Sequence, residues 1–97
     1  MTTIRHVVLR GRVQGVGFRA FVEETAANAR VGGWVRNRRD GTVEAMFAGD
    51  RRLVEETIAA CRKGPPAARV DVADVRDSNA EELALRGAEN FAVLPTV

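Results

Sequence analysis

Two helical stripes of apolar residues, one before and one after a β-hairpin pattern, constrain the fold of this chain most. Apolar side chains recur at helical spacing over residues 18–29 and again over residues 51–63, and Asp50 is suited to cap the second helix. Between the stripes, residues 34–38 and 42–48 have the pattern of short strands joined by a turn that contains glycine. We therefore expect two helices separated by a hairpin.

Three further segments have strand patterns. Residues 4–10 are rich in branched apolar side chains, residues 69–76 alternate between apolar and polar side chains, and residues 91–94 can form a short last strand, which Pro95 confines to an edge. We expect the polar segment 77–89 to be irregular, with one helical turn at most. The order β-α-β-β-α-β with a trailing strand predicts an α+β, ferredoxin-like split βαβ sandwich, an antiparallel sheet with two helices on one face.

Composition narrows the class of protein. The chain has 97 residues, 45% of them hydrophobic, so we expect one domain over residues 1–97. A single cysteine, Cys61, and a single histidine, His6, favour neither an internal disulfide nor a metal site. No stretch resembles a targeting segment or a membrane span, which favours a cytoplasmic protein without a membrane partner.

The glycine-dense segment 11–17, between the first strand and the first helix, is the clearest candidate for a binding site. Its glycines allow left-handed backbone conformations, which turn successive N–H groups inward and form a concavity for an anion. The next helix adds the positive end of its dipole, and Arg19 in its first turn can direct a planar guanidinium at the same anion. The segment therefore predicts a site for a phosphate-like group.

The predicted topology places Asn37 opposite this segment. In a split βαβ sheet the first two strands are parallel and the third lies between them, so their C-terminal ends meet one edge about 10 Å apart. We expect Arg19 and Asn37 to face one small cleft, although eighteen positions separate them. Four more arginines lie near this edge and favour an anionic ligand: Arg10, Arg12, Arg38 and Arg39.

Three familiar phosphate motifs fit the segment poorly. Gly15 to Ala20 match a dinucleotide fingerprint, but the acidic residue that should follow the second strand is preceded by two arginines. A P-loop would need a lysine and a serine or threonine after Gly17. A cysteine phosphatase would need its nucleophile at the position of Val13.

An RNA-recognition module shares the predicted topology and is the alternative from a different functional class. Its first and third strands should carry exposed aromatic residues that stack on bases. Here the first strand offers only His6, and the third offers only Phe47, on the expected core face. We therefore expect no nucleic-acid partner, and keep a binding module as the alternative.

The stretches GRVQGVGFR (11–19) and GWVRNRRDGTVE (33–44) resemble acylphosphatases, a similarity that extends over nearly the whole chain. The resemblance implies a monomeric, metal-free enzyme without a cofactor, which hydrolyses a small-molecule acyl phosphate to a carboxylate and inorganic phosphate. It also implies that Arg19 and Asn37 are catalytic, and that Asn37 positions the attacking water. The residues that it implies for phosphate binding are Val13, Gln14, Gly15, Val16, Gly17, Phe18 and Arg19.

The residues around the predicted cleft suit this chemistry. No Asp or Glu precedes Glu23, so we expect the cleft to contain no general acid or base. An acyl phosphate needs neither, because its leaving group is a carboxylate of pKa about 4, which departs unprotonated. A domain that handles carbamoyl phosphate within a larger protein is a further alternative.

Overall fold

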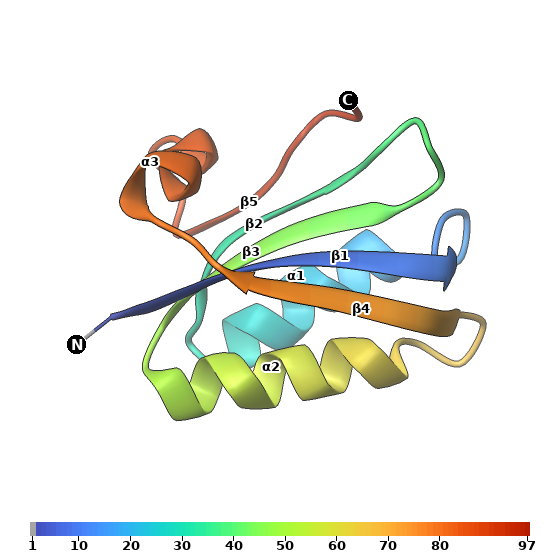
Figure 1. Cartoon of the computed structure of the whole chain (residues 1–97), viewed down its shortest axis with the longest axis horizontal. Coiled ribbons are helices and arrows are strands. Elements are labelled where there is room, and N and C mark those ends of the chain that lie inside the picture. The colour runs from blue at the N-terminus through green and yellow to red at the C-terminus, as the bar shows by residue number, and fades with distance from the viewer. Residues whose placement is uncertain (1) are drawn as a thin grey trace.

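The computed structural model describes residues 2–97, which form a five-stranded sheet with helices on both faces (Figure 1). Strand order across the sheet is β4-β1-β3-β2-β5. No helix in this part of the chain is long and apolar enough to cross a membrane. The elements in chain order are β1 (Thr3–Arg12), α1 (Phe18–Asn28), β2 (Gly32–Asn37), β3 (Val43–Gly49), α2 (Arg51–Lys63), β4 (Arg69–Asp77), α3 (Ala80–Leu83), the short 3-10 helix η1 (Ala84–Arg86) and β5 (Phe91–Val93).

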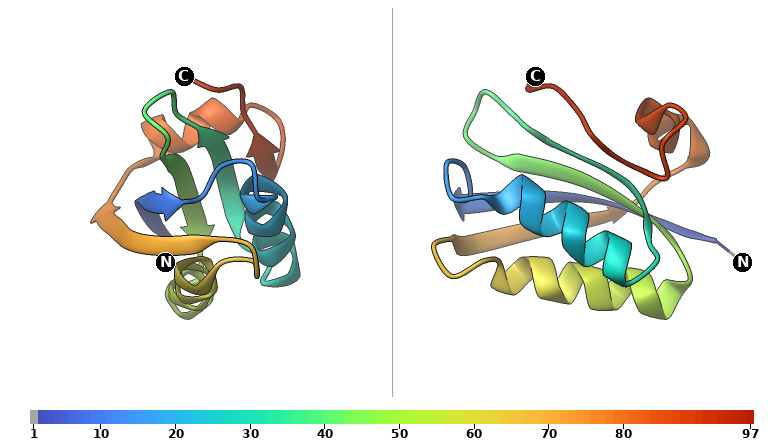
Figure 2. Two further views of the ribbon diagram at one scale, coloured as in Figure 1. Left: turned by 90° about the vertical axis from the view of Figure 1, so that its right-hand side faces the viewer. Right: turned by 180° about the vertical axis from the view of Figure 1, so that it is seen from behind.

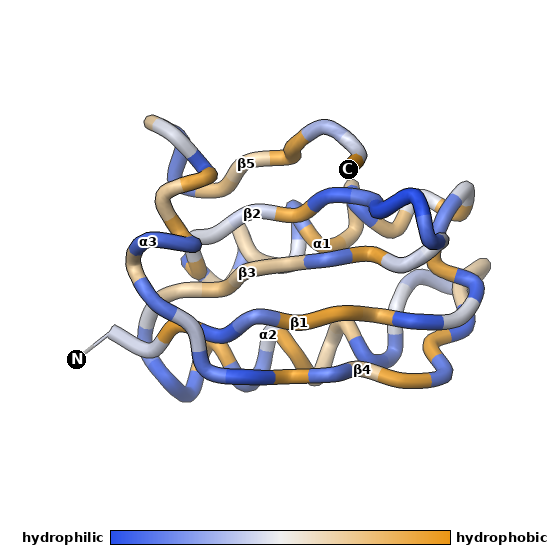
Figure 3. Tube along the Cα trace, turned by 45° about the horizontal axis from the view of Figure 1, so that its top comes forward, coloured by the Kyte–Doolittle hydropathy of each residue, from blue (hydrophilic) through white to orange (hydrophobic). Residues whose placement is uncertain are grey.

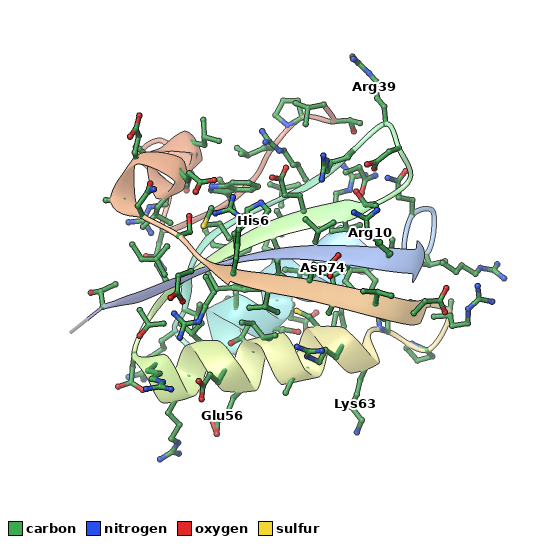
Figure 4. All side chains as sticks on the ribbon, viewed as in Figure 1. His6, Arg10, Arg39, Glu56, Lys63 and Asp74 are labelled. Atoms are coloured by element: carbon green, nitrogen blue, oxygen red, sulfur yellow. The ribbon has the colours of Figure 1, made fainter. Side chains whose placement is uncertain are left out.

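The central three strands confirm the predicted split βαβ arrangement. Both β1 and β2 pair with β3 in antiparallel register, so they run parallel to each other. Their C-terminal ends therefore point to the same edge of the sheet. The helix α2 spans the predicted residues 51–63, and its N-cap Asp50 accepts hydrogen bonds from the N–H groups of Arg52 and Leu53. Glu56 and Lys63 on this helix point away from the sheet (Figure 4).

The sheet is mixed, so the prediction of an antiparallel sheet was wrong for the last strand. β5 pairs with β2 in parallel register, with Gly33 opposite Phe91. The cause is the connection through α3 and η1, which crosses one end of the sheet. β4 ends where Asp77 pairs with Arg5, near the start of β1. The connection then crosses to the same end of the sheet at β2, so β5 and β2 begin together and run parallel. This connection contains two short helices, α3 and η1, where a single helical turn was expected over residues 77–89.

Two apolar clusters hold the layers together. The larger cluster lies between the sheet and the helices α1 and α2, and it includes Val43, Ala45 and Phe47, which share one face of β3 as predicted. The smaller cluster lies on the other face, where Leu83 of α3 packs against Trp34 and Met46. In Figure 3 the apolar stretch of β1 lies inside the sheet, while polar residues recur along the edge strand β4.

The pairing of β1 with β4 contains a β-bulge. This pairing continues to Arg12, so β1 extends into the segment expected to be a loop. The register shifts between Arg10 and Gly11, which pair with Val72 and Val70, so Asp71 is the extra residue. Gly11 has a φ of 131°, and a Cβ built on it would lie 2.2 Å from the carbonyl oxygen of Arg69. The strand predicted for residues 69–76 is confirmed as β4, but the bulge reverses the alternation of its side chains near Asp71.

We predict that Gly11→Ala lowers the free energy of unfolding by about 3 kcal/mol, because it adds a backbone clash to the strain of a positive φ. Gly41 is the matched control, since its φ is 92° but a Cβ there meets nothing within 4 Å. Gly41→Ala should cost only about 1 kcal/mol. Urea unfolding of both variants measures the difference, and equal losses would contradict the close approach at the bulge.

Candidate functional site

A cleft of about 380 Å³ opens where the end of β1, the start of α1 and the end of β2 meet. Arg19 and Asn37, which come from α1 and β2, both line it. Val16 does not line the cleft, because its side chain packs against the larger apolar cluster. The lining residues are Val13, Gln14, Gly15, Gly17, Phe18, Arg19, Ala20, Glu23, Asn37 and Val93.

The backbone of residues 13–17 has the conformation that an anion-binding concavity needs. Gly15 and Gly17 have φ values of 73° and 76°, in the left-handed region that side-chain-bearing residues avoid. Figure 2 shows this segment as an arch between the end of β1 and the start of α1. Such a turn directs successive N–H groups to one side, where they can donate to a single negative group.

The first turn of α1 leaves its N–H groups free at this cleft. Gly17 is the N-cap and supplies no side-chain hydrogen bond, and the first turn contains no acidic residue. By contrast, side chains cap both α2 and α3, through Asp50 and Asn79. The positive end of the α1 dipole and its unpaired donors therefore face the cleft without an internal partner, a favourable setting for an anion.

Arg19 is half-buried, and its guanidinium is available to a ligand. It makes no ion pair and no side-chain hydrogen bond with any other of residues 2–97. Two of the four neighbouring arginines are already engaged, since Arg10 pairs with Asp74 and Arg38 lies 4.0 Å from Asp40. Arg39 extends outward from the hairpin (Figure 4) and does not line the cleft. Arg19 is therefore the one arginine among the lining residues, and a guanidinium can hold an anion through two hydrogen bonds.

The side chain of Gln14 ties the loop to the hairpin that carries Asn37. Its Nε2 donates to the carbonyl oxygens of Arg38 at 2.7 Å and Thr42 at 2.8 Å. Sequence reasoning counted Gln14 only among the residues that bind phosphate and missed this contact. No pattern in the sequence signals it, because the two carbonyls belong to backbone 24 and 28 positions away.

The C-terminal tail holds the backbone of Asn37 from the other side. Beyond β5, Leu94 donates its N–H to Val35 at 2.9 Å, and Val97 donates to Asn37 at 3.2 Å. The carbonyl of Val97 accepts from the N–H of Arg39 at 2.7 Å. Figure 1 shows the tail alongside β2 as far as the hairpin turn. Asn37 is therefore fixed between β3 and the tail, with its side chain facing the cleft.

The cleft includes one carboxylate, that of Glu23, although we expected it to contain no general acid or base. Glu23 lies one helical turn after Arg19 on the same face of α1, and both line the cleft. The spacing of four residues could have revealed this. Sequence reasoning also missed Ala20, which follows Arg19 in the first turn, and Val93, which reaches the cleft only because β5 pairs with β2.

The face of the sheet away from α1 and α2 provides no stacking platform for bases. His6 Nε2 lies 2.6 Å from Glu44, which also accepts from Arg36 at 2.7 Å. Burial alone would raise the pKa of Glu44, but the hydrogen bonds from His6 and Arg36 outweigh it and lower that pKa. The guanidinium carbon of Arg36 lies 4.7 Å from the centre of the Trp34 ring, so this ring face is not free to stack on a base. The nucleic-acid alternative is therefore not favoured.

The single cysteine is part of the core. Cys61 is fully buried in the larger apolar cluster, and burial raises the pKa of its thiol to about 12. A thiol in that state is a poor nucleophile. Cys61 therefore supplies no nucleophile to the cleft, whose lining residues do not include it.

The fold and the cleft together define a ferredoxin-like α+β protein with a site built for an anion between a glycine loop and a hairpin. Comparisons with known proteins specify the family. The acylphosphatase family model matches residues 5–92. An acylphosphatase of Bradyrhizobium diazoefficiens is 56% identical over 95 residues, which cover 97% of this chain and 96% of that protein. The chain belongs to the acylphosphatase family.

Solved structures agree with this assignment. The crystal structure of an acylphosphatase from Bacillus subtilis matches with a TM-score of 0.84 and 34% identity, covering 97% of this chain and 99% of that one. Full-length HypF, in a phosphate- and nucleotide-bound form, matches with the same TM-score and 26% identity, but the match covers only 12% of that chain. The end-to-end matches are to acylphosphatases, so the alternative of a carbamoyl-phosphate-handling domain is not favoured.

We predict that Gln14→Leu lowers the free energy of unfolding by about 2 kcal/mol, because it removes two hydrogen bonds and leaves each carbonyl with only its backbone donor. Gln14→Glu keeps the shape but replaces the donating group with an oxygen, and should cost at least as much. Urea unfolding of both variants measures the loss. A stability within about 0.5 kcal/mol of wild type for both would show that the tether contributes little.

Proposed function

We propose that this protein hydrolyses acyl phosphates, with the phosphate held by the 13–19 loop and Arg19 and the attacking water positioned by Asn37. The observation that carries the proposal is that Arg19, Asn37 and the glycine loop line one cleft. In the proposed reaction a water oxygen bonds to phosphorus while the bond from phosphorus to the acyl oxygen breaks. The electron pair leaves with the carboxylate, and a water proton passes to the phosphate.

Positioning and charge neutralisation account for most of the catalysis in this proposal. Phosphoryl transfer spreads negative charge over three equatorial oxygens, and preorganised donors stabilise it. The free N–H groups at the start of α1 and the guanidinium of Arg19 are donors of that kind. The backbone N–H groups are fixed before the substrate arrives, so these donors need little reorganisation in the transition state.

Asn37 is suited to hold the nucleophile. Its side chain makes no hydrogen bond with any other of residues 2–97, although its backbone is fixed by β3 and the tail. A carboxamide can both donate to and accept from a water. Because β2 and α1 approach the cleft from opposite sides, a water on Asn37 can attack a phosphate bound by the loop.

We further propose that the protein acts as a monomer and that the reaction requires neither a metal nor another cofactor. Within residues 2–97, no group of three or more His, Cys, Asp or Glu side chains could hold a metal ion. The cationic end of the cleft already supplies the positive charge that a divalent ion would bring. The carboxylate leaving group also needs no Lewis acid, since it is stable without protonation.

We predict that Arg19→Ala lowers kcat/KM for benzoyl phosphate at least about a thousandfold, and that Asn37→Ala lowers it about a hundredfold. Both side chains are partly exposed and unpaired, so both variants should keep the fold. Arg12→Ala is the control, because it removes a nearby positive charge from outside the cleft and should retain nearly full activity. Phosphate release measures the rates, and circular dichroism checks the fold.

The same assay separates the competing functions. Excess EDTA should leave the rate unchanged, and a loss that magnesium restores would contradict a metal-free reaction. Comparing benzoyl with carbamoyl phosphate tests the narrower alternative, because a carbamoyl-specific domain would turn over only the latter. Wild-type activity in Arg19→Ala would refute the assigned role. Tight binding of single-stranded RNA without turnover of acyl phosphates would contradict the proposed activity and favour a nucleic-acid-binding module.

A further inference from the structure

We infer that Glu23 selects the acyl group: it forms, with Ala20 and Val93, an acyl subsite that accepts uncharged or cationic acyl groups and disfavours those carrying a carboxylate. The inference rests on the proposed function, since it assigns the part of the cleft that phosphate does not use. All three residues line the same cleft as Arg19 and Asn37. None of them belongs to the 13–19 loop.

The size of the cleft leaves room for such a subsite. Its volume is about 380 Å³, whereas a water-sized group takes about 30 Å³, so the cleft has room for roughly twelve such groups. A phosphate contributes five non-hydrogen atoms, which the loop and the start of α1 gather at one end. The substrate atoms beyond the anhydride oxygen must therefore fill the remainder of the cleft or leave it for solvent.

The remainder of the cleft has a distinct chemistry. Ala20 and Val93 present apolar surface, and Val93 is 44% exposed although it belongs to β5. Glu23 adds the only carboxylate among the lining residues. It makes no ion pair and no side-chain hydrogen bond with any other of residues 2–97, so its charge is not neutralised from within. An apolar wall with one free carboxylate suits an acyl chain ending in a donor or a cation.

The spacing on α1 orders the two charges along the substrate. Arg19 lies in the first turn, at the anion end, and Glu23 lies one turn further along the same face. A rise of 1.5 Å per residue separates their backbones by about 6 Å along the axis, close to the length of a benzoyl group. A substituent para to the carbonyl should therefore come near Glu23, while the phosphate stays with Arg19.

The repulsion of an anionic acyl group should be moderate, because Glu23 is exposed and water screens it. Unit charges about 6 Å apart at an interface of intermediate dielectric change a rate constant by roughly three- to tenfold. Selectivity of that size is readily measured as a ratio of kcat/KM values. Removing the charge of Glu23 should reduce this selectivity, and reversing that charge should invert the preference.

The experiment compares three benzoyl phosphates that differ only at the para position: carboxy, methyl and aminomethyl. Wild type should prefer aminomethyl over carboxy by about fivefold or more in kcat/KM. Glu23→Gln should reduce this preference to about onefold, and Glu23→Lys should favour the carboxy substrate. All three proteins should hydrolyse the uncharged methyl substrate with kcat within about twofold. Glu24→Gln is the matched control, since it removes the same net charge from an adjacent exposed position outside the cleft.

The outcomes separate this inference from the proposed function. If wild type fails to hydrolyse the methyl substrate, the proposed function itself fails. If it hydrolyses all three and Glu23→Gln leaves their ratios unchanged, the acyl subsite is wrong and the proposed function stands. If Glu23→Gln lowers kcat for the methyl substrate a hundredfold and removes a limb of its pH–rate profile, Glu23 is a general base rather than a selecting residue. An equal change in Glu24→Gln would also overturn the inference, because net charge alone would explain it.

Discussion

The parallel alignment of β1 and β2, with β3 between them, is the constraint on which the cleft depends. Two strand spacings of about 5 Å separate their C-terminal ends, so the segments that follow β1 and β2 can face each other across a gap. The loop after β1 turns at its glycines directly into α1 and brings Arg19 to one side of that gap. Asn37, the last residue of β2, comes to the other side. Neither residue needs a long or strained connection to reach its place.

Three independent contacts keep this gap at one width. Gln14 connects the loop to the hairpin, the tail pairs with Asn37 and Arg39, and Asp40 stabilises the hairpin turn. The Asp40 carboxylate accepts from the hydroxyl and the N–H of Thr42, and these hydrogen bonds lower its pKa. As a result the carboxylate holds the turn down to more acidic pH than an unpaired one would. A site that depends on fixed donors requires such support, because small displacements weaken every contact with the anion together.

Sequence patterns predicted the parts of this structure that local chemistry determines. The α2 helix was predicted to the residue, because Asp50 and Gly64 mark its ends and its apolar stripe is regular. The position of Arg19 across from Asn37 followed from topology alone. What escaped prediction depends on contacts between distant segments. The bulge at Asp71 exists because Gly11 allows a close approach, and the direction of β5 depends on where its crossing connection enters.

The same distinction applies within the cleft. Gln14 was expected at the phosphate, yet its side chain bonds two carbonyls that no pattern identifies. Val93 lines the cleft only through the unforeseen parallel pairing of β5. Glu23 is different, because its helical spacing from Arg19 was visible in the sequence and was overlooked. The residues that line such a cleft are therefore predicted best when the helix face is followed one turn beyond the residue proposed to bind the anion.

Titration of ¹⁵N-labelled protein with inorganic phosphate, followed by amide chemical shifts, tests most directly whether one pocket gathers the anion. We expect saturable shifts for the N–H groups of Gly15, Gly17 and Phe18, together with the guanidinium Nε–H of Arg19 and the carboxamide of Asn37. Those signals should move with a single dissociation constant. The shared site would be contradicted by shifts confined to the opposite face of the sheet, around His6. Different dissociation constants for the loop and for Asn37 would contradict it as well.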